Sequence, residues 1–333
     1  MILRRLEALW WLTRLYLNAS PVWLVTIGWL AADGDSWWRL ALLYLFVITA
    51  GSAHMILNDI LDVEPDRVTA PYLPLAADLL TVEEARRGMI ALAIVATAAL
   101  AAASPSLAVF GACVALVALS AVGTRVYSAH KAWGAADSLF VGLSMAVTAT
   151  IGWLVGGHEN IGDLALIAPY GLVYGFTANT WAALRDFDRD GLVGNLTLPV
   201  RVGGSKTVQI ALVTSVIQYV LAAALLALNG FEPAAAAILA GGFAVQAFAA
   251  PRTRRRFAIP NLGRPQRLAD LRLIRFGETL RFAGVVAIYS LPAALIVGLV
   301  LELSLTFGGR AYRRRIIDGE LRRSMEVDGL KAA

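Results

Sequence analysis

The sequence predicts an all-α integral membrane protein, with about nine transmembrane helices around a central cavity and loops that cap its cytoplasmic end. Of its 333 residues, 58% are hydrophobic and 16% are charged, and the mean hydropathy is +0.66. Soluble domains contain roughly 45–50% apolar and about 25% charged residues. This much apolar surface needs lipid as its solvent, which excludes a soluble enzyme, a disordered chain and a secreted disulfide scaffold.

The apolar stretches give the helix count, because a spanning helix needs roughly 20 apolar residues. They are 17–33, 38–57, 87–103, 105–125, 133–156, 162–183, 208–228, 232–250 and 284–306. The chain therefore divides into an N-terminal segment (1–16), a transmembrane domain (17–306) and a basic tail (307–333).

The charge pattern gives the expected topology. Basic residues outnumber acidic ones by 29 to 24, an excess that in a membrane protein favours contact with lipid headgroups over nucleic-acid binding. We therefore expect membrane lipid, and no nucleic acid, as a partner. Arg4, Arg5 and Arg14 precede the first apolar stretch and indicate a retained, cytoplasmic N-terminus.

Two further basic segments bear on topology. Residues 251–281 carry nine Arg against two acidic residues, and we interpret them as a cytoplasmic loop lying on anionic lipid, with no part in catalysis. The tail, 307–333, is also basic, yet nine helices would place it outside. Either the tail is an exception to the positive-inside rule or one span is miscounted.

An acidic cluster directly follows the second apolar stretch. It contains Asn58, Asp59, Asp62 and Asp66, with the carboxylates three and four residues apart. If the helix continues through them, all three carboxylates lie on one face. Unpaired carboxylates on one face repel each other, and hard divalent cations with oxygen ligands would remove that repulsion.

A second acidic cluster ends the sixth apolar stretch. Asp186 and Asp190 are four residues apart and share a helix face, whereas Asp188 points elsewhere. Both clusters fall at the cytoplasmic ends of even-numbered helices, so they can converge across a bundle. Because Mg²⁺ usually takes one or two carboxylates together with water and phosphate oxygens, two facing clusters predict a diphosphate held through Mg²⁺. A solvated helix cap is the simpler alternative, and the presence of two matching clusters argues against it.

At these residues the sequence resembles the UbiA superfamily of intramembrane prenyltransferases. The family's first motif, Asn-Asp-x-x-Asp-x-x-x-Asp, is complete from Asn58 to Asp66, and its second, Asp-x-x-x-Asp, is present at Asp186 and Asp190. A third and weaker signature is similar around Tyr127 and Lys131. The resemblance spans about residues 10 to 305.

The resemblance implies an enzyme that binds an isoprenyl diphosphate through Mg²⁺, ionises it, and passes the allylic cation to an aromatic or lipid acceptor. It implies metal binding by Asp59, Asp62, Asp66, Asp186 and Asp190, and a catalytic part for all of these except Asp66. The location would be a membrane, such as a bacterial cell membrane, with the site facing the cytoplasm.

Basic and aromatic side chains near the motifs are candidates for contacts with the substrate. Lys131, which matches a family position and is one of three lysines, is the first choice, with a catalytic part as well. The other candidates are Asn58, Arg67, Tyr127, Tyr174, Arg185 and Arg201. Arg14 either meets an acidic acceptor or marks the membrane boundary.

The sequence departs from the family at two loops. Residues 71–77 contain no basic side chain where many members carry Arg or Lys. Asn195 and Leu196 likewise stand where similar members have basic residues. These departures keep two alternatives open. One is a terpene cyclase of the same superfamily, which needs no acceptor, and the other is a non-catalytic prenyl-lipid-binding or transport protein.

Overall fold

The computed structural model is helical, and it contains no strand in the residues that it describes, which are 2–15, 18–129, 134–157, 161–192, 194, 196–259 and 262–319. The chain forms two compact units, each built from segments that are distant in sequence. Unit 1 consists of Met1–Val22, Trp37–Ser104 and Leu299–Ala333, and unit 2 of Trp23–Ser36 and Pro105–Gly298.

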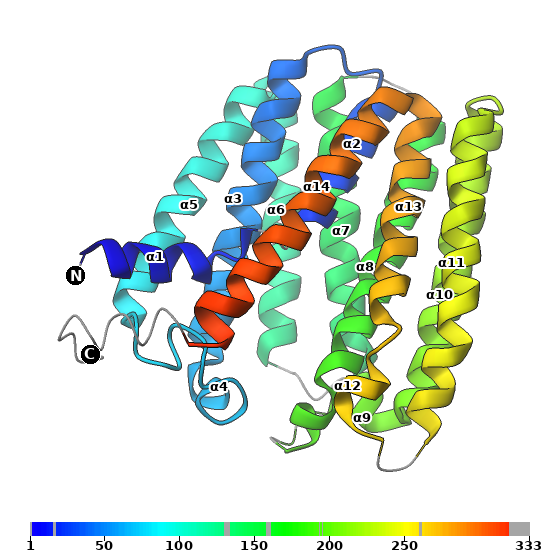
Figure 1. Ribbon diagram of the computed structural model, residues 1–333. Coiled ribbons are helices and arrows are strands. Elements are labelled where there is room, and N and C mark those ends of the chain that lie inside the picture. The colour runs from blue at the N-terminus through cyan, green and yellow to red at the C-terminus, as the bar shows by residue number, and fades with distance from the viewer. Residues whose placement is uncertain are drawn as a thin grey trace. The chain divides into compact units, whose positions relative to one another are not determined.

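Unit 1 is built around two long helices that lie side by side (Figure 1). Its helices are α1 (Ile2–Leu12), the start of α2 (Ala19–Ala31), α3 (Trp37–Leu61), α4 (Val63–Thr69), α5 (Val82–Ala103), most of α14 (Leu291–Tyr312) and the π-helical turn η3 (Arg313–Ile317). α3 packs along α5, and the loop after α4 folds back onto α1 and η3 through buried Leu73, Leu75 and Leu79. This apolar loop occupies the place where the sequence lacks the family's basic residues.

Unit 2 is a series of antiparallel neighbours that pack in chain order (Figure 1). Its helices are the rest of α2, α6 (Leu107–Ala129), α7 (Ala135–Gly156), α8 (Ile161–Leu192), α9 (Leu198–Val202), α10 (Gly204–Leu228), α11 (Pro233–Ala258), α12 (Arg264–Arg267), α13 (Leu271–Tyr289) and the start of α14. Each long helix contacts the next, from α6 through α7, α8, α10 and α11 to α13.

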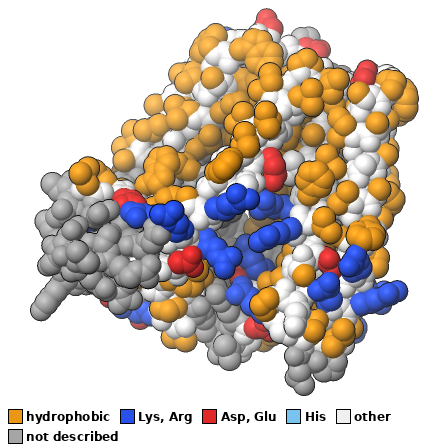
Figure 2. All heavy atoms as spheres, in the orientation of Figure 1, with side chains coloured by type: hydrophobic (Ala, Val, Ile, Leu, Met, Phe, Trp, Pro, Cys, Tyr) orange, Lys and Arg blue, Asp and Glu red, His pale blue; other side chains and the backbone are white. Residues whose placement is uncertain are grey.

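The predicted helical membrane fold is confirmed, whereas the count of nine is not. Among the described residues, seven helices are long and apolar enough to cross a membrane, and two shorter apolar helices, Ala19–Ala31 and Leu107–Gly123, match the first and fourth predicted stretches. Figure 2 shows hydrophobic side chains along most of the visible helices and Lys and Arg side chains gathered in the lower half of the view. This distribution is typical of a protein whose helices are in contact with lipid.

The last predicted span, 284–306, is wrong, because the structure divides it between two helices. α13 ends at Tyr289, Ser290 is extended, and α14 begins at Leu291. Pro292 lacks an N–H and cannot donate the hydrogen bond that a continuous helix needs, whereas in the first turn of a new helix this N–H is not required. The Ser290 hydroxyl accepts a hydrogen bond from the Ala293 N–H at 3.3 Å and caps the new helix.

The predicted loop 251–281 is also wrong in its extent. α11 continues to Ala258 and α13 begins at Leu271, so the connection is much shorter. α13 was missed because it carries Arg272, Arg275, Glu278 and Arg281, which mask its helical apolar face. Arg281 is nevertheless fully buried and donates a hydrogen bond to Gln246 Oε1 at 3.3 Å.

The approach of α2 to α7 in unit 2 depends on glycine. A Cβ atom on Gly28 of α2 would lie 2.0 Å from the Ala149 carbonyl oxygen of α7. A Cβ atom on Gly152 of α7 would lie 2.3 Å from the Val25 carbonyl oxygen of α2. Both are backbone clashes that no side-chain rotation relieves. The two helices therefore approach closely only because neither residue has a side chain, as is common between membrane helices.

We expect Gly152→Ala to lower the unfolding temperature of the purified protein in detergent, because the added methyl group forces α2 away from α7. Overpacking of this kind costs roughly 1–3 kcal/mol. The matched control is Gly241→Ala in α11, where the new Cβ meets nothing within 4 Å and should be neutral or stabilising. Equal unfolding temperatures for the two variants would contradict this packing.

Candidate functional site

The first acidic cluster spans the junction between α3 and α4, where Asp62 is the N-cap residue of α4 with a φ of −102° and a ψ of 9°. The Asp62 N–H donates to the Asn58 carbonyl at 2.9 Å, and the Asp66 N–H donates to the Asp62 carbonyl at 2.8 Å. These i→i+4 bonds carry the helical repeat from α3 into α4. As a result Asp59, Asp62 and Asp66 share one face, as the spacing predicts. Asp59 is buried, and Asn58, Asp62 and Asp66 are partly exposed.

Arg14 neutralises the buried member of this cluster. Its Nη2 atom donates to Asp59 Oδ1 at 2.7 Å and to Oδ2 at 2.9 Å, and the two side chains are 20% and 7% exposed. Arg14 lies in the turn between α1 and α2 with a φ of +47°, a left-handed conformation that is strained for a residue with a side chain. The ion pair holds this turn against the end of α3. Arg14 therefore contacts the first motif, which the sequence analysis did not predict.

Arg67 lies beside the first cluster but faces the loop that follows it. Its Nη2 atom donates to Asp78 Oδ1 at 2.8 Å, and its Nε atom is 3.7 Å from Glu64 Oε1. The hydrogen bond that Arg67 donates to Asp78, together with the negative charge of Asp78, raises the pKa of the Arg67 guanidinium above its usual value. Arg67 therefore ties the loop to α4, and its exposed guanidinium remains within reach of ligands at this end of the helix.

The second acidic cluster lies on the last turns of α8, which is 32 residues long and extends past its apolar part. Asp186 and Asp190 are one helical turn apart and both are partly exposed. The Thr197 hydroxyl donates to Asp190 Oδ2 at 2.9 Å, so the start of α9 fixes this carboxylate. Arg185, the predicted substrate contact, is exposed, and its Nη2 atom lies 3.3 Å from Asp186 Oδ2.

Sequence reasoning missed two residues that contact this cluster from 79 positions away. Arg264 donates through Nε and Nη2 to the Arg185 carbonyl at 3.2 and 3.1 Å, and Arg267 pairs with the Asp188 carboxylate. Both belong to α12, which lies beside the end of α8 in Figure 1. The only sequence signal was the charge of the segment, which the positive-inside rule already explained. Through α12, this basic segment therefore lies against the second acidic cluster.

Among the remaining predicted side chains of unit 2, the structure describes those of Tyr174 and Arg201. Tyr174 is buried, with its ring centroid 4.5 Å from that of Phe282 in an edge-on contact. Arg201 of α9 donates from Nε to the Leu196 carbonyl at 3.1 Å. Lys131 lies outside the described residues. So does the side chain of Tyr127, although its backbone belongs to α6.

The donor set suits a hard divalent cation. Each cluster presents carboxylate oxygens at helical spacing, and each Asp59 oxygen keeps a lone pair beyond its bond to Arg14. Among the described residues, no three His, Cys, Asp or Glu side chains are grouped so that they alone could hold a metal ion. Mg²⁺ does not need such a group, because it usually takes one or two carboxylates and completes its shell with water and phosphate oxygens. The first cluster belongs to unit 1 and the second to unit 2.

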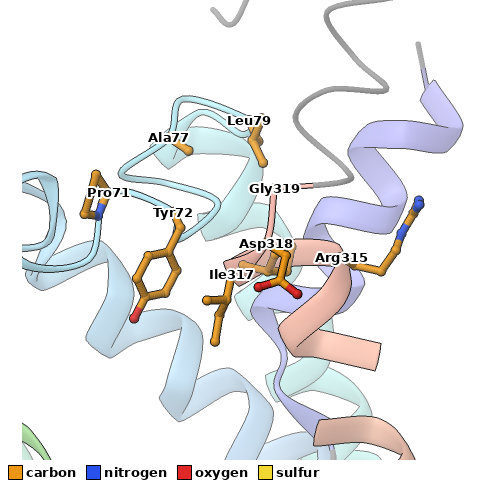
Figure 3. A pocket seen from close by; sticks show the side chains of 9 residues that line it. Pro71, Tyr72, Ala77, Leu79, Arg315, Ile317, Asp318 and Gly319 are labelled. Atoms are coloured by element: carbon orange, nitrogen blue, oxygen red, sulfur yellow. The ribbon is translucent and has the colours of Figure 1, made fainter. Parts of the chain in front are cut away.

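A separate cavity of about 230 Å³ lies in unit 1, between the 71–79 loop and the end of η3. Figure 3 shows Tyr72 and Ile317 on opposite sides of it, with the Asp318 carboxylate close by. None of the predicted site residues lines this cavity. It has no place in the diphosphate chemistry that the sequence predicts.

Comparisons with known proteins identify the fold. The model of the UbiA prenyltransferase family matches residues 11–261. The solved structure of a digeranylgeranylglyceryl phosphate synthase matches with a TM-score of 0.64 at 15% identity, over 86% of this chain and 98% of that one. A UbiA homologue from Archaeoglobus fulgidus bound to DMAPP and Mg²⁺ matches with a TM-score of 0.58 at 21% identity, over 81% of this chain and 98% of that one.

An apo UbiA homologue from Aeropyrum pernix K1 gives a TM-score of 0.60 at 17% identity, over 85% of this chain and 98% of that one. At these identities the likeness shows a common fold. No match was found among curated protein sequences.

We expect Arg14→Gln to lower the free energy of unfolding by about 3 kcal/mol, because it leaves the Asp59 carboxylate buried without its counter-charge. Thermal and denaturant unfolding in detergent, with a chelator present, would measure the loss. Arg67→Gln is the matched control, because it also removes an Arg–Asp pair but an exposed one. If both variants have the same free energy of unfolding as the wild type, the Arg14–Asp59 pair does not hold the end of α3.

Proposed function

Because the chain belongs to the UbiA prenyltransferase family, we propose that it is a Mg²⁺-dependent membrane enzyme that transfers a prenyl group from an isoprenyl diphosphate to an aromatic or lipid acceptor. The observation that carries this proposal is the pair of carboxylate clusters on helices that extend past their apolar parts. Both clusters have the family's motif residues in full. The DMAPP and Mg²⁺ held by the Archaeoglobus fulgidus homologue support the same ligands here.

In this proposal each cluster holds one metal ion. Asp59, Asp62 and Asp66 provide oxygens for the first, and Asp186 and Asp190 for the second. Asn58 orients the first cluster at its edge. Bound Mg²⁺ would neutralise the negative charge that develops on the departing diphosphate.

The basic side chains share the diphosphate's charge with these metals. Arg67 lies beside the first cluster, Arg185 and Arg201 belong to the same unit as the second cluster, and Lys131 is included because of the family resemblance alone. Positive groups fixed before the reaction stabilise the leaving group without reorganisation. As the carbon–oxygen bond breaks, its electron pair leaves with the diphosphate, and the acceptor supplies the pair that forms the new bond to the prenyl carbon.

Aromatic side chains would protect the cation. Tyr174 belongs to an aromatic group in unit 2 with Tyr170 and Trp23, all of which pack around Phe282. Ring faces attract a carbocation as they attract other cations, and a dry surrounding keeps water from capturing it. We place the site on the cytoplasmic side of a bacterial cell membrane, because the basic segments gather with the motifs.

A terpene cyclase is the second candidate, and a specific observation favours it. The loop of residues 71–77, where basic residues are missing, is packed with apolar side chains, and Leu75 is only 3% exposed. A cyclase needs the same ionisation but no acceptor. A non-catalytic prenyl-lipid-binding or transport protein is the remaining alternative.

The test is turnover of C10 to C20 prenyl diphosphates by the purified full chain with Mg²⁺, with and without a panel of aromatic and lipid acceptors. We expect diphosphate release that depends on Mg²⁺ and on an acceptor. Asp62→Ala should lower kcat by roughly 10²–10³ or more, because it removes a metal ligand, while the unfolding temperature stays unchanged. The matched control is Glu83→Ala, which removes an exposed carboxylate paired with Arg86 and Arg87.

Each outcome decides between the candidates. Full turnover by Asp62→Ala would refute the metal assignment. A cyclic hydrocarbon formed without any acceptor would establish the cyclase. Binding of prenyl diphosphate without release of diphosphate under any condition would leave the non-catalytic alternative.

A further inference from the structure

The short helix α12 is docked on the second acidic cluster through the backbone as well as through charge. Arg264 donates two hydrogen bonds to the carbonyl of Arg185, the residue directly before Asp186. The same Arg264 Nη2 atom lies 3.7 Å from Asp186 Oδ1. Its guanidinium is therefore held next to a motif carboxylate by a contact that does not depend on that carboxylate.

Arg267 anchors α12 at its other end. It pairs with the carboxylate of Asp188, which lies between the two motif residues but off their face. Its guanidinium also lies 5.9 Å from the Phe187 ring centroid and 6.0 Å from that of Phe257, and its side chain is 17% exposed. A flat guanidinium between aromatic rings loses little freedom when it binds. The anchor thus uses no metal-binding side chain.

The polypeptide around α12 is held in the same way. Arg256 of α11 donates to the Gln266 carbonyl at 2.6 Å, and its Nε atom lies 3.0 Å from Asp270 Oδ2. The Gly263 N–H donates to Gln266 Oε1 at 3.1 Å. α12 is therefore attached to α8 on one side and to α11 on the other, so that Arg264 is placed by the fold rather than by its own flexibility.

The bonding of Arg264 leaves it able to bind an anion. A guanidinium has five N–H donors in a planar fork, and the bonds to the Arg185 carbonyl use one on Nε and one on Nη2. At 3.7 Å the contact with Asp186 is an ion pair without a hydrogen bond. With 38% of its side chain exposed, Arg264 is open to a ligand. If Asp186 bound a divalent cation, the metal would neutralise that carboxylate, and the positive charge of Arg264 would then be available to another anion.

From this geometry, and resting on the proposed function, we infer that Arg264 binds the diphosphate of the prenyl substrate at the second metal cluster. Arg forks bind phosphate oxygens through paired hydrogen bonds. The inference also accounts for a departure in the sequence. Asn195 and Leu196 stand where similar sequences carry basic residues, and Arg264 supplies a positive charge to the same cluster from a different segment of the chain.

The test measures binding of inorganic diphosphate, with saturating Mg²⁺, to the full chain in detergent by calorimetry. Loss of a charge-assisted hydrogen bond changes an affinity roughly ten- to a hundredfold, and we expect Arg264→Gln to weaken diphosphate binding by that factor. Arg264→Lys should recover part of it, since the charge remains without the fork. Arg255→Gln is the matched control, because it removes an exposed Arg of the same basic segment and should leave binding unchanged.

A second readout separates a substrate contact from a structural role. With Mn²⁺ alone, Arg264→Gln should bind the metal as tightly as the wild type or more tightly, because a positive neighbour of Asp186 has been removed. If α12 only holds α8 in place, Arg264→Gln will weaken Mn²⁺ and diphosphate binding together, and the inference is overturned.

The remaining outcomes show whether the inference fails alone or together with the proposed function. Wild-type affinity for diphosphate in Arg264→Gln overturns the inference and leaves the function standing. Equal losses in Arg264→Gln and Arg255→Gln point to net charge alone and also overturn it. If the wild type itself binds no diphosphate, the proposed function and the inference fail together.

Discussion

Negative charge at the end of an apolar helix is the constraint on which this structure depends. A carboxylate near the bilayer is costly unless a positive group or water compensates it. In this chain the compensation comes from arginine. Arg14 meets Asp59 at the end of α3, α12 meets Asp186 and Asp188 at the end of α8, and Arg256 meets Asp270. Each of these four carboxylates has a guanidinium placed by another segment.

This arrangement has a consequence for ligand binding. The carboxylates of each cluster are held at helical spacing by the backbone, so they do not have to be assembled when a metal arrives. The arginines that neutralise them are fixed by separate contacts, such as the Arg185 carbonyl for Arg264. At each cluster both signs of charge are therefore in place before any ligand binds, which is the arrangement that the proposed electrostatic catalysis requires.

The sequence predicted what depends on local chemistry. The apolar stretches predict most of the long helices, and the spacing of Asp59, Asp62 and Asp66 predicts the helical repeat that the hydrogen bonds carry across the junction of α3 and α4. The capping box at the start of α5 is local chemistry of the same kind. Its Glu84 N–H donates to the Thr81 hydroxyl at 3.2 Å, and the Thr81 N–H donates to Glu84 at 2.9 Å. The family was recognised from the same local motifs.

The sequence did not predict what depends on contacts between distant segments. Arg264 lies 79 residues from Arg185, and Arg14 lies 45 residues from Asp59. No periodicity or composition encodes either pairing. α13 was missed because its charged side chains, including the buried Arg281, make the helix resemble a polar loop in sequence.

The central proposal is that the carboxylates of each cluster bind a divalent metal ion, and electron paramagnetic resonance with Mn²⁺ in place of Mg²⁺ tests it most directly. With inorganic diphosphate present, the account predicts bound Mn²⁺ in the wild type. It also predicts that Asp62→Asn and Asp190→Asn each lower the amount of Mn²⁺ bound. Unchanged Mn²⁺ binding in both variants would contradict the account.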